Sequence, residues 1–289
     1  MGIKDFFVQY WWLVLLGMVV VIILSFIGGS FLMSNRISKE IDQLMSMDSK
    51  KEVRDESRIT QEDLEGLPEP VKRWLLSVGV VGKKKVRSVE FSQRGDMKLE
   101  PDQKHWLEAK AKQYIRVDQP GFLWHVDLPM IPLINTKGRD LFYEGNSLME
   151  VRIGSLIPVV NAKDSKKLDE SALHRFLLEI PLYPTAALED YMTWEAIDQE
   201  SAKGILTYKN MTVAADFYFQ EDGTLEMMES LRYKDHDEQA KRIPCIGRIN
   251  DHKEYNGIKI PTKVEITWVM DDIPFTWYKL ENYDVKFED

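Results

Sequence analysis

The first apolar block of the chain is long enough to cross a membrane. Residues 6–35 contain no charged side chain, and residues 11–27 are almost wholly apolar. A helix rises about 1.5 Å per residue and the hydrocarbon core is about 30 Å thick, so roughly twenty apolar residues span it. Aromatic rings, which settle at the headgroup level, open the block at Tyr10, Trp11 and Trp12. We therefore expect residues 1–35 to form an N-terminal transmembrane anchor of a single-pass protein.

A cleaved signal peptide is the alternative to an anchor. Its apolar core would be about 7–15 residues long and would end at an A-x-A-like site, whereas this block is longer and ends at Gly28, Gly29 and Ser30. The single cysteine, Cys245, lies deep in the chain, which excludes a lipid-modified cysteine after this segment. We therefore expect an uncleaved anchor that is not a lipoprotein anchor.

The side of the membrane on which the rest of the chain lies stays undecided. One lysine precedes the apolar block, and several Lys and Arg residues follow it, which favours a cytoplasmic carboxyl side. The difference is small. A lone cysteine makes no internal disulfide, and this fits either compartment.

A helical pattern continues directly after the anchor. Ile37, Ile41, Leu44 and Met45 recur at helical spacing, and a charged, nonperiodic stretch follows. We expect residues 36–59 to form an amphipathic stalk and a linker, and residues 60–289 to form one folded domain. That domain opens with a helix at 68–78, where Pro residues lie in the first turn, apolar residues share one face and Gly79 follows.

From Val86 onward the period of the pattern changes to two. Apolar and polar positions alternate in short segments bounded by turn residues, as at Glu144-Gly145-Asn146 and Asp222-Gly223. Parallel strands would need intervening helices, so this spacing predicts an antiparallel sheet or barrel. About eleven strands are expected, at 86–99, 106–117, 121–128, 139–152 (folded as a hairpin), 194–197, 202–208, 211–219, 225–233, 248–255, 259–270 and 276–287.

Two features interrupt the strands. A second helix is expected from a cap at or near Asp169, with its apolar face covering one side of the sheet, to Pro181. Three proline-punctuated apolar segments, at 128–134, 156–162 and 180–188, fit neither period and are too apolar for ordinary loops. We expect them to form a mobile mouth over the sheet.

Composition and motifs exclude several classes of function. The chain has 38 Lys plus Arg and 47 Asp plus Glu, a net charge of −9, so no nucleic-acid partner is expected. No short catalytic or nucleotide-binding motif occurs, and we predict no catalytic residue, no cofactor and no metal site. Asp235, His236, Asp237, Asp251 and His252 would form a metal centre only if two strand ends met.

Other polar residues are predicted to be structural or to lie at a cavity. His174, His125 and Cys245 are expected to be buried without a chemical role. Arg139 and Asp140 lie in a strand among apolar neighbours, where a charge must be paired or hydrated. We expect them to form an ion pair, either at a sheet edge or at a cavity mouth.

Several sequence motifs resemble a bacterial family of domains of unknown function. The run at 67–75, Gln93-Arg94-Gly95-Asp96-Met97, Gly121-Phe122-Leu123-Trp124 and Gly138-Arg139-Asp140 carry the resemblance, which extends over residues 67–283. The family is similar in fold to lipoprotein carriers of the LolA and LolB type. The resemblance implies an α+β, mainly β fold, in which a large curved antiparallel sheet, or half-barrel, is covered by a few helices around an apolar cavity. It also implies a bacterial cell membrane.

These features lead to one functional hypothesis and two alternatives. The chain is predicted to be a membrane-tethered binding module for a lipid, acyl chain or other apolar ligand. Residues predicted to bind the ligand are Trp106, Phe122, Trp124, Leu128, Met130, Ile131 and Arg139. The alternatives are an envelope scaffold or sensor that oligomerises through the stalk, and a metal-assisted hydrolase.

Overall fold

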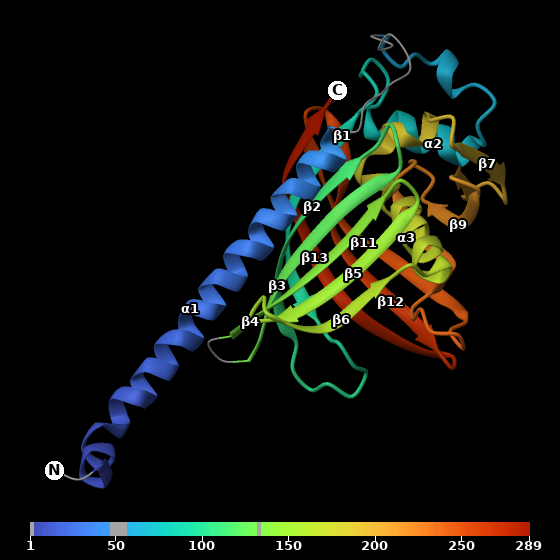
Figure 1. Ribbon diagram of the computed structural model, residues 1–289. Helices are drawn as coiled ribbons and strands as arrows, with labels where there is room; N and C mark the ends of the chain where they lie inside the picture. Colours follow the sequence, from blue (N-terminus) through green and yellow to red (C-terminus); the bar gives the residue numbers. More distant parts are fainter. Residues whose placement is uncertain (1–2, 47–56, 132–133) are drawn as a thin grey trace.

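The computed structural model describes residues 3–46, 57–131 and 134–289, and its centre is a 13-stranded antiparallel sheet. The sheet consists of two meanders that join where β1 (Ser88–Met97) pairs with β13 (Ile273–Glu288). Its order is β6-β5-β4-β3-β2-β1-β13-β12-β11-β10-β9-β8-β7, and the two outer strands do not pair with each other. The predicted fold class, mainly β with an open curved sheet covered by helices, is confirmed (Figure 1).

The sheet has thirteen strands, whereas the sequence pattern predicts about eleven. The remaining eleven are β2 (Leu107–Arg116), β3 (Gly121–Ile131), β4 (Ile134–Tyr143), β5 (Asn146–Ile153), β6 (Ile157–Lys163), β7 (Met192–Ala196), β8 (Ser201–Tyr208), β9 (Met211–Phe219), β10 (Leu225–Tyr233), β11 (Arg242–Tyr255) and β12 (Ile258–Met270).

The three proline-punctuated segments are not three loops. The first lies at the ends of β3 and β4, where the pairing register shifts between Leu128 and Ile131. The second is largely β6, an edge strand, where a proline removes no ladder hydrogen bond from a neighbour. The third forms two short 3-10 helices, η2 (Ile180–Leu182) and η3 (Pro184–Leu188). Two of the three segments therefore belong to the sheet, since prolines at an edge strand and at a register shift leave the sheet intact. That the segments form a mobile mouth stays a prediction.

Helix α3 (Lys166–Glu179) connects the two edge strands of the sheet, β6 and β7, and packs against the concave face. It contacts β9, β10, β5 and β4 (Figure 1). Its N-cap is Ser165, whose Oγ accepts from the Leu168 amide. The cap predicted at or near Asp169 is thus Ser165, four residues earlier, and the Asp169 carboxylate accepts from the Ser147 amide, at 2.6 Å. α2 (Glu69–Val78) packs at another part of the sheet, and η1 (Glu62–Leu64) precedes it.

Helix α1 (Ile3–Met45) is one continuous helix that includes the apolar block and the predicted stalk residues. Its second half packs on the convex face of β2 and β3, where Met33, Ile37 and Leu44 form a separate apolar cluster with Leu123. The guanidinium of the buried Arg116 donates to the Met45 carbonyl at 2.7 Å, which satisfies the end of the helix. The first half of α1 extends beyond the sheet (Figure 1).

Candidate functional site

A cavity of about 310 Å³ lies between the concave face of the sheet and α3. Its wall is mainly apolar because β1 and β10–β13 present their inward positions here, and α3 and η2 close the other side. The apolar and aromatic lining residues include Leu178, Leu182, Met228, Ile266, Trp268 and Leu280. Such a volume is at the lower end of the range for small-molecule sites, about 300–1,000 Å³.

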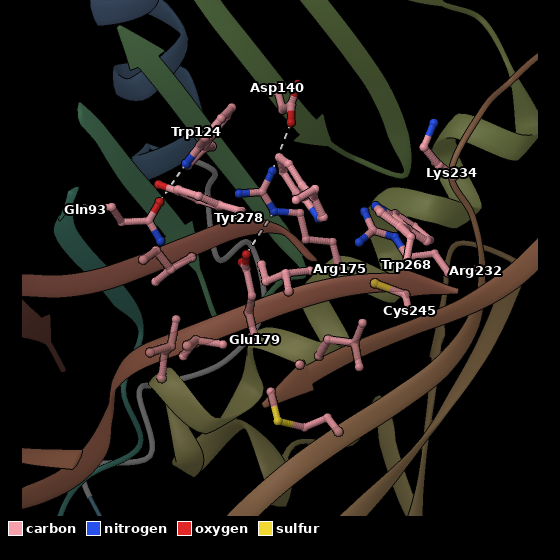
Figure 2. A pocket seen from close by; sticks show the side chains of 18 of the residues that line it. Gln93, Trp124, Asp140, Arg175, Glu179, Arg232, Lys234, Cys245, Trp268 and Tyr278 are labelled. Carbon is pink, nitrogen blue, oxygen red and sulfur yellow. Dashed lines mark hydrogen bonds and ion pairs between the residues drawn. The ribbon is translucent and has the colours of Figure 1, made fainter. Parts of the chain in front are cut away.

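A charged cluster lies in this mainly apolar wall, centred on Arg175 of α3. Its Nη1 donates to Asp140 of β4 at 2.9 Å, and its Nε donates to Glu179 at 2.9 Å (Figure 2). Its Nη2 donates to the Gln113 side-chain oxygen at 3.1 Å. The guanidinium also lies 5.0 Å from the centre of the Trp124 ring. Arg175 is thus fully committed to protein partners.

Burial and the attraction between opposite charges together determine the pKa values in this cluster. Burial lowers the pKa of Arg175, but Glu179 and Asp140 outweigh it, so the pKa is raised and the cation is retained. Burial raises the pKa of Asp140, although Arg175 and Arg232 oppose this. The two carboxylates that line the cavity are therefore both used by one arginine.

A second, uncharged chain of hydrogen bonds crosses the floor of the cavity. Trp124 Nε1 donates to the Gln93 side-chain oxygen at 2.7 Å, and Gln93 Nε2 donates to the Asn282 oxygen at 2.9 Å (Figure 2). These residues come from β3, β1 and β13, which are neighbours in the sheet or one strand apart. The chain satisfies buried polar groups that would otherwise destabilise the wall.

Two exposed lining residues mark where the cavity reaches the surface. Leu99 follows β1, and Lys234 follows β10. In an antiparallel sheet every second connection lies at the same end, so the segment 98–106, the β5–β6 turn at 154–156 and the β12–β13 turn at 271–272 lie at one end of the sheet. We call these three segments the helix-exit end, because α1 leaves the sheet there.

Contacts of α1 with the β5–β6 turn locate this exit. The Ser30 hydroxyl lies 3.3 Å from that of Ser155. A Cβ atom on Gly154 would overlap the Phe26 ring, and Gly154 has a φ of +58°. The strongly apolar residues of α1 that precede Phe26 therefore lie beyond this end of the sheet (Figure 1). The mouth at Leu99 and the exit of α1 share one end.

By length and composition, α1 can cross a membrane. The candidate span is Trp11–Met45, whose most apolar window is hardly buried within the protein. A signal sequence near the N-terminus would satisfy the same criteria.

Arg139, predicted at a cavity mouth or sheet edge as the partner of Asp140, lies elsewhere. It is fully buried on the convex face, where it pairs with Glu40 of α1 and, at 3.0 Å, with Glu150 of β5. Asp140 faces the cavity and pairs with Arg175. The predicted ion pair is therefore wrong, because consecutive residues of a strand point to opposite faces.

The structure separates the aromatic residues predicted to bind ligand. Trp124 lines the cavity. Phe122 is buried beside it and lines a smaller cavity of about 90 Å³, with the Arg175 guanidinium 4.9 Å from its ring centre. Trp106 lies at the helix-exit end outside the cavity, with the ammonium groups of Lys98 and Lys279 5.0 and 5.5 Å from its ring centre.

The remaining predicted ligand-binding residues lie along β3. Leu128 is buried in the main apolar core. Met130 and Ile131 belong to the same strand, and their side chains are outside the described part of the structure. Ligand contact by these residues stays a prediction.

Sequence reasoning missed the two arginines that face the cavity, Arg175 and Arg232. A charged residue in a segment of this kind is usually exposed, and Arg175 lies in a helix whose inward face depends on how the helix packs. The available signal was Gln113 and Asp140, two polar side chains at inward positions of strands on either side of β3, which needed a buried partner.

The remaining candidate groups have structural surroundings. His174 is buried, and its Nδ1 lies 3.1 Å from the Glu170 carbonyl oxygen; burial lowers its pKa to about 4. Cys245 is buried in the cavity wall, and burial raises its pKa. Within the described residues, no group of three or more His, Cys, Asp or Glu side chains is arranged to hold a metal ion.

Comparisons with known proteins match this chain to a family and find a similar solved structure among those compared. The model of a family of unknown function (DUF6920) matches residues 65–287, which confirms the resemblance to such a family. Among solved structures, a LolA superfamily protein from Nitrosomonas europaea is similar with a TM-score of 0.41 and 12% sequence identity, over 76% of this chain and 94% of that chain. No curated protein matches.

Proposed function

The chain belongs to this family of unknown function, and we propose that it is a membrane-tethered module that binds a lipid or another apolar ligand in the cavity under α3. The observation that supports this most directly is the shared position of the mouth and the exit of α1. If α1 spans the bilayer, Leu99 and the β5–β6 turn face the membrane surface. An apolar ligand would then pass between the bilayer and the cavity over a short path.

Exposed apolar side chains at the helix-exit end support the same proposal. Ile157 on β6 is 57% exposed, and Ile273 at the β12–β13 turn is 68% exposed. Apolar residues concentrated at one end of a sheet are costly in water and are stabilised against a lipid surface. Contact of this end with the bilayer would also give the cavity access to its ligand, because apolar ligands are abundant in the bilayer.

The test uses the full chain, because the second half of α1 packs on β2 and β3 and covers them on the convex face of the sheet. The purified protein is released from detergent in a mass spectrometer, and bound small molecules are counted on the intact chain. We expect one bound amphiphile per chain. A variant that fills the cavity, Ile266→Trp, should lose it, whereas Ile157→Trp on the exposed strand should keep it.

Equal occupancy of the two variants would show that the bound molecules belong to α1 and not to the cavity. Absence of a bound molecule from the unsubstituted chain, also after incubation with bacterial phospholipid vesicles, would refute the proposed function. Circular dichroism of each variant establishes that the sheet is intact.

A further inference from the structure

Arg232, a cation of the cavity wall, has no carboxylate partner among the described residues. Arg232 of β10 donates from Nε to the Ser171 carbonyl oxygen at 2.9 Å and to its hydroxyl at 3.0 Å, which fixes the side chain against α3. Its guanidinium carbon lies 5.4 Å from the centre of the Trp268 ring. Figure 2 shows it beside Trp268 and Cys245, within the cavity. Its two terminal nitrogens therefore meet no anion of the described chain.

The carboxylates of the cavity wall attract this cation but do not pair with it. Asp140 and Glu179, the two carboxylates of the cavity wall, both pair with Arg175. The Cys245 thiol hydrogen-bonds Arg232, but burial raises the pKa of this thiol, so it stays neutral. Burial also lowers the pKa of Arg232 itself. A desolvated cation without an anion is costly, and a bound anion would offset the cost.

Other polar atoms of the cavity wall also favour a ligand with acceptor oxygens. Within the described residues, Trp277 Nε1 and the Tyr278 hydroxyl are buried without a hydrogen-bond partner, and both line the cavity. Both can donate, and burial raises the pKa of Tyr278, which keeps its proton. Lys98 adds a positive charge to the wall, with its ammonium 5.0 Å from the centre of the Trp106 ring, whereas Lys234 at the mouth pairs with Asp235. The unsatisfied groups of the cavity are thus donors and cations, which fit a ligand that supplies acceptor oxygens.

We propose that the cavity binds a single-chain anionic amphiphile, whose carboxylate or phosphate head is held by the terminal nitrogens of Arg232. The proposal rests on the proposed function and adds the class of ligand. A guanidinium that uses Nε for the protein still presents two parallel donors, which match the two oxygens of such a head group. The acyl chain would contact Leu178, Leu182 and Met228, which line the same cavity.

The test is photolabelling of the full chain in phosphatidylcholine nanodiscs. Palmitic acid that carries a diazirine in its chain is compared with hexadecanol that carries the same diazirine, and labelled peptides are mapped by mass spectrometry. We expect the acid to label cavity-lining peptides at least tenfold more than the alcohol. Arg232→Gln should remove this preference, whereas Arg248→Gln, on the exposed side of β11, should keep it.

A second pair of variants covers the case in which Arg232→Gln does not fold. Cys245→Asp places a carboxylate beside Arg232 and should reduce labelling by the acid at least tenfold while labelling by the alcohol persists. Cys245→Ser is its control and should label as the unsubstituted chain does.

The outcomes separate the two proposals. Equal labelling of the cavity by acid and alcohol in the unsubstituted chain would overturn the anionic ligand but keep an apolar site. Labelling confined to α1 peptides would overturn both. Inorganic phosphate is added as a competitor: loss of labelling by the acid would indicate a site for free anions and overturn the amphiphile.

Discussion

Arg139 and Asp140 are consecutive residues of β4, and their side chains stabilise opposite faces of the sheet. The Arg139 guanidinium pairs with Glu150, at 3.0 Å, and with Glu40 of α1 on the convex face. The Asp140 carboxylate pairs with Arg175 of α3, at 2.9 Å, on the concave face. One strand therefore fixes both the helix that leaves the sheet and the helix that covers the cavity.

Loss of the Arg139 charge should weaken the attachment of α1. In Arg139→Met, the Glu150 carboxylate stays buried, at 2% exposure, and loses its cationic partner from β4. Breaking a buried pair by removing one partner costs about 3–5 kcal/mol. We expect a loss of this order in the free energy of unfolding of the full chain, measured in urea.

The control is Arg36→Met, which removes a half-exposed cation that faces the same two carboxylates at 3.4 and 3.7 Å. Exposed pairs contribute about 0–1 kcal/mol, so this variant should remain close to the unsubstituted chain. Similar losses in both variants would contradict a specific role of the buried pair.

Removal of the Arg175 charge should destabilise the cavity in a pH-dependent way. In Arg175→Met, Asp140 and Glu179 lose their cation, and burial then raises the pKa of Asp140 further. We expect a loss of about 3–5 kcal/mol at pH 8 and a smaller loss at pH 5, where the Asp140 carboxyl takes up a proton more readily. Thermal unfolding at the two pH values checks this, and a pH-independent loss would contradict it.

The alternation of apolar and polar residues predicts hairpins of the sheet but not the contacts between strands and helices. The hairpin at Glu144-Gly145 appears where the turn residues predict it, since β4 ends at Tyr143 and β5 begins at Asn146. The sequence marks Asp140 as an unusual charge among apolar neighbours. It does not mark the partner, Arg175, because the distance between a strand and a helix 35 residues later depends on tertiary packing.

The strand β6 was missed for a different reason. Pro158 disfavours an interior strand, and the sequence does not reveal that this segment lies at the edge of the sheet. The docking of α1 on the convex face was missed likewise. Ile37 and Leu44 mark an apolar face at helical spacing, but nothing in the pattern specifies whether a stalk packs on its own domain or on another chain.

His174 should make stability depend on pH. Its pKa in the folded protein is about 4, below the ordinary 6.5 because burial disfavours the charged ring. The unfolded chain therefore takes up a proton as the pH falls through 6.5, and the folded chain does not until about pH 4. Stability is complete above this window and is lost as the pH falls, by about 2 kcal/mol at pH 5.

The measurement is the difference in unfolding free energy between pH 7.5 and pH 5 for the unsubstituted chain and His174→Gln. We expect the substituted chain to lose less, by about 2 kcal/mol. Burial also lowers the pKa of His125 and His252, but these contributions are common to both proteins and cancel. An equal pH dependence in both would assign the acid sensitivity to other groups.

Gly95 should be intolerant of any side chain. A Cβ atom at this position of β1 would overlap the Lys279 carbonyl oxygen of β13, a backbone atom that the sheet fixes. Gly95→Ala should therefore force the central β1–β13 pair apart and lower the thermal midpoint by several degrees. Gly247→Ala is the control, because its Cβ atom would meet the flexible end of Met228 at 3.1 Å. Equal midpoints for the two variants would contradict the backbone clash.

Spin labels should distinguish the two ends of the sheet if α1 is a membrane anchor. In a Cys245→Ser background, single cysteines replace Ile157, Ile273 or Leu76. All three are exposed and apolar, but Leu76 lies on α2, which packs near the β11–β12 turn at the opposite end of the sheet. We expect labels at 157 and 273, in nanodiscs, to collide with oxygen dissolved in the bilayer, and a label at 76 to collide mainly with a water-soluble nickel complex.

The three labels together test the path of the ligand. Bilayer contact at 157 and 273 would put the mouth beside Leu99 within reach of the lipid surface, because these residues share the helix-exit end. Water contact at all three positions would separate the cavity from the bilayer, and ligand entry would then need a soluble donor. If bilayer contact at 157 and 273 changes to water contact after removal of residues 3–25, then α1, and not the apolar end of the sheet, controls how the domain lies on the membrane.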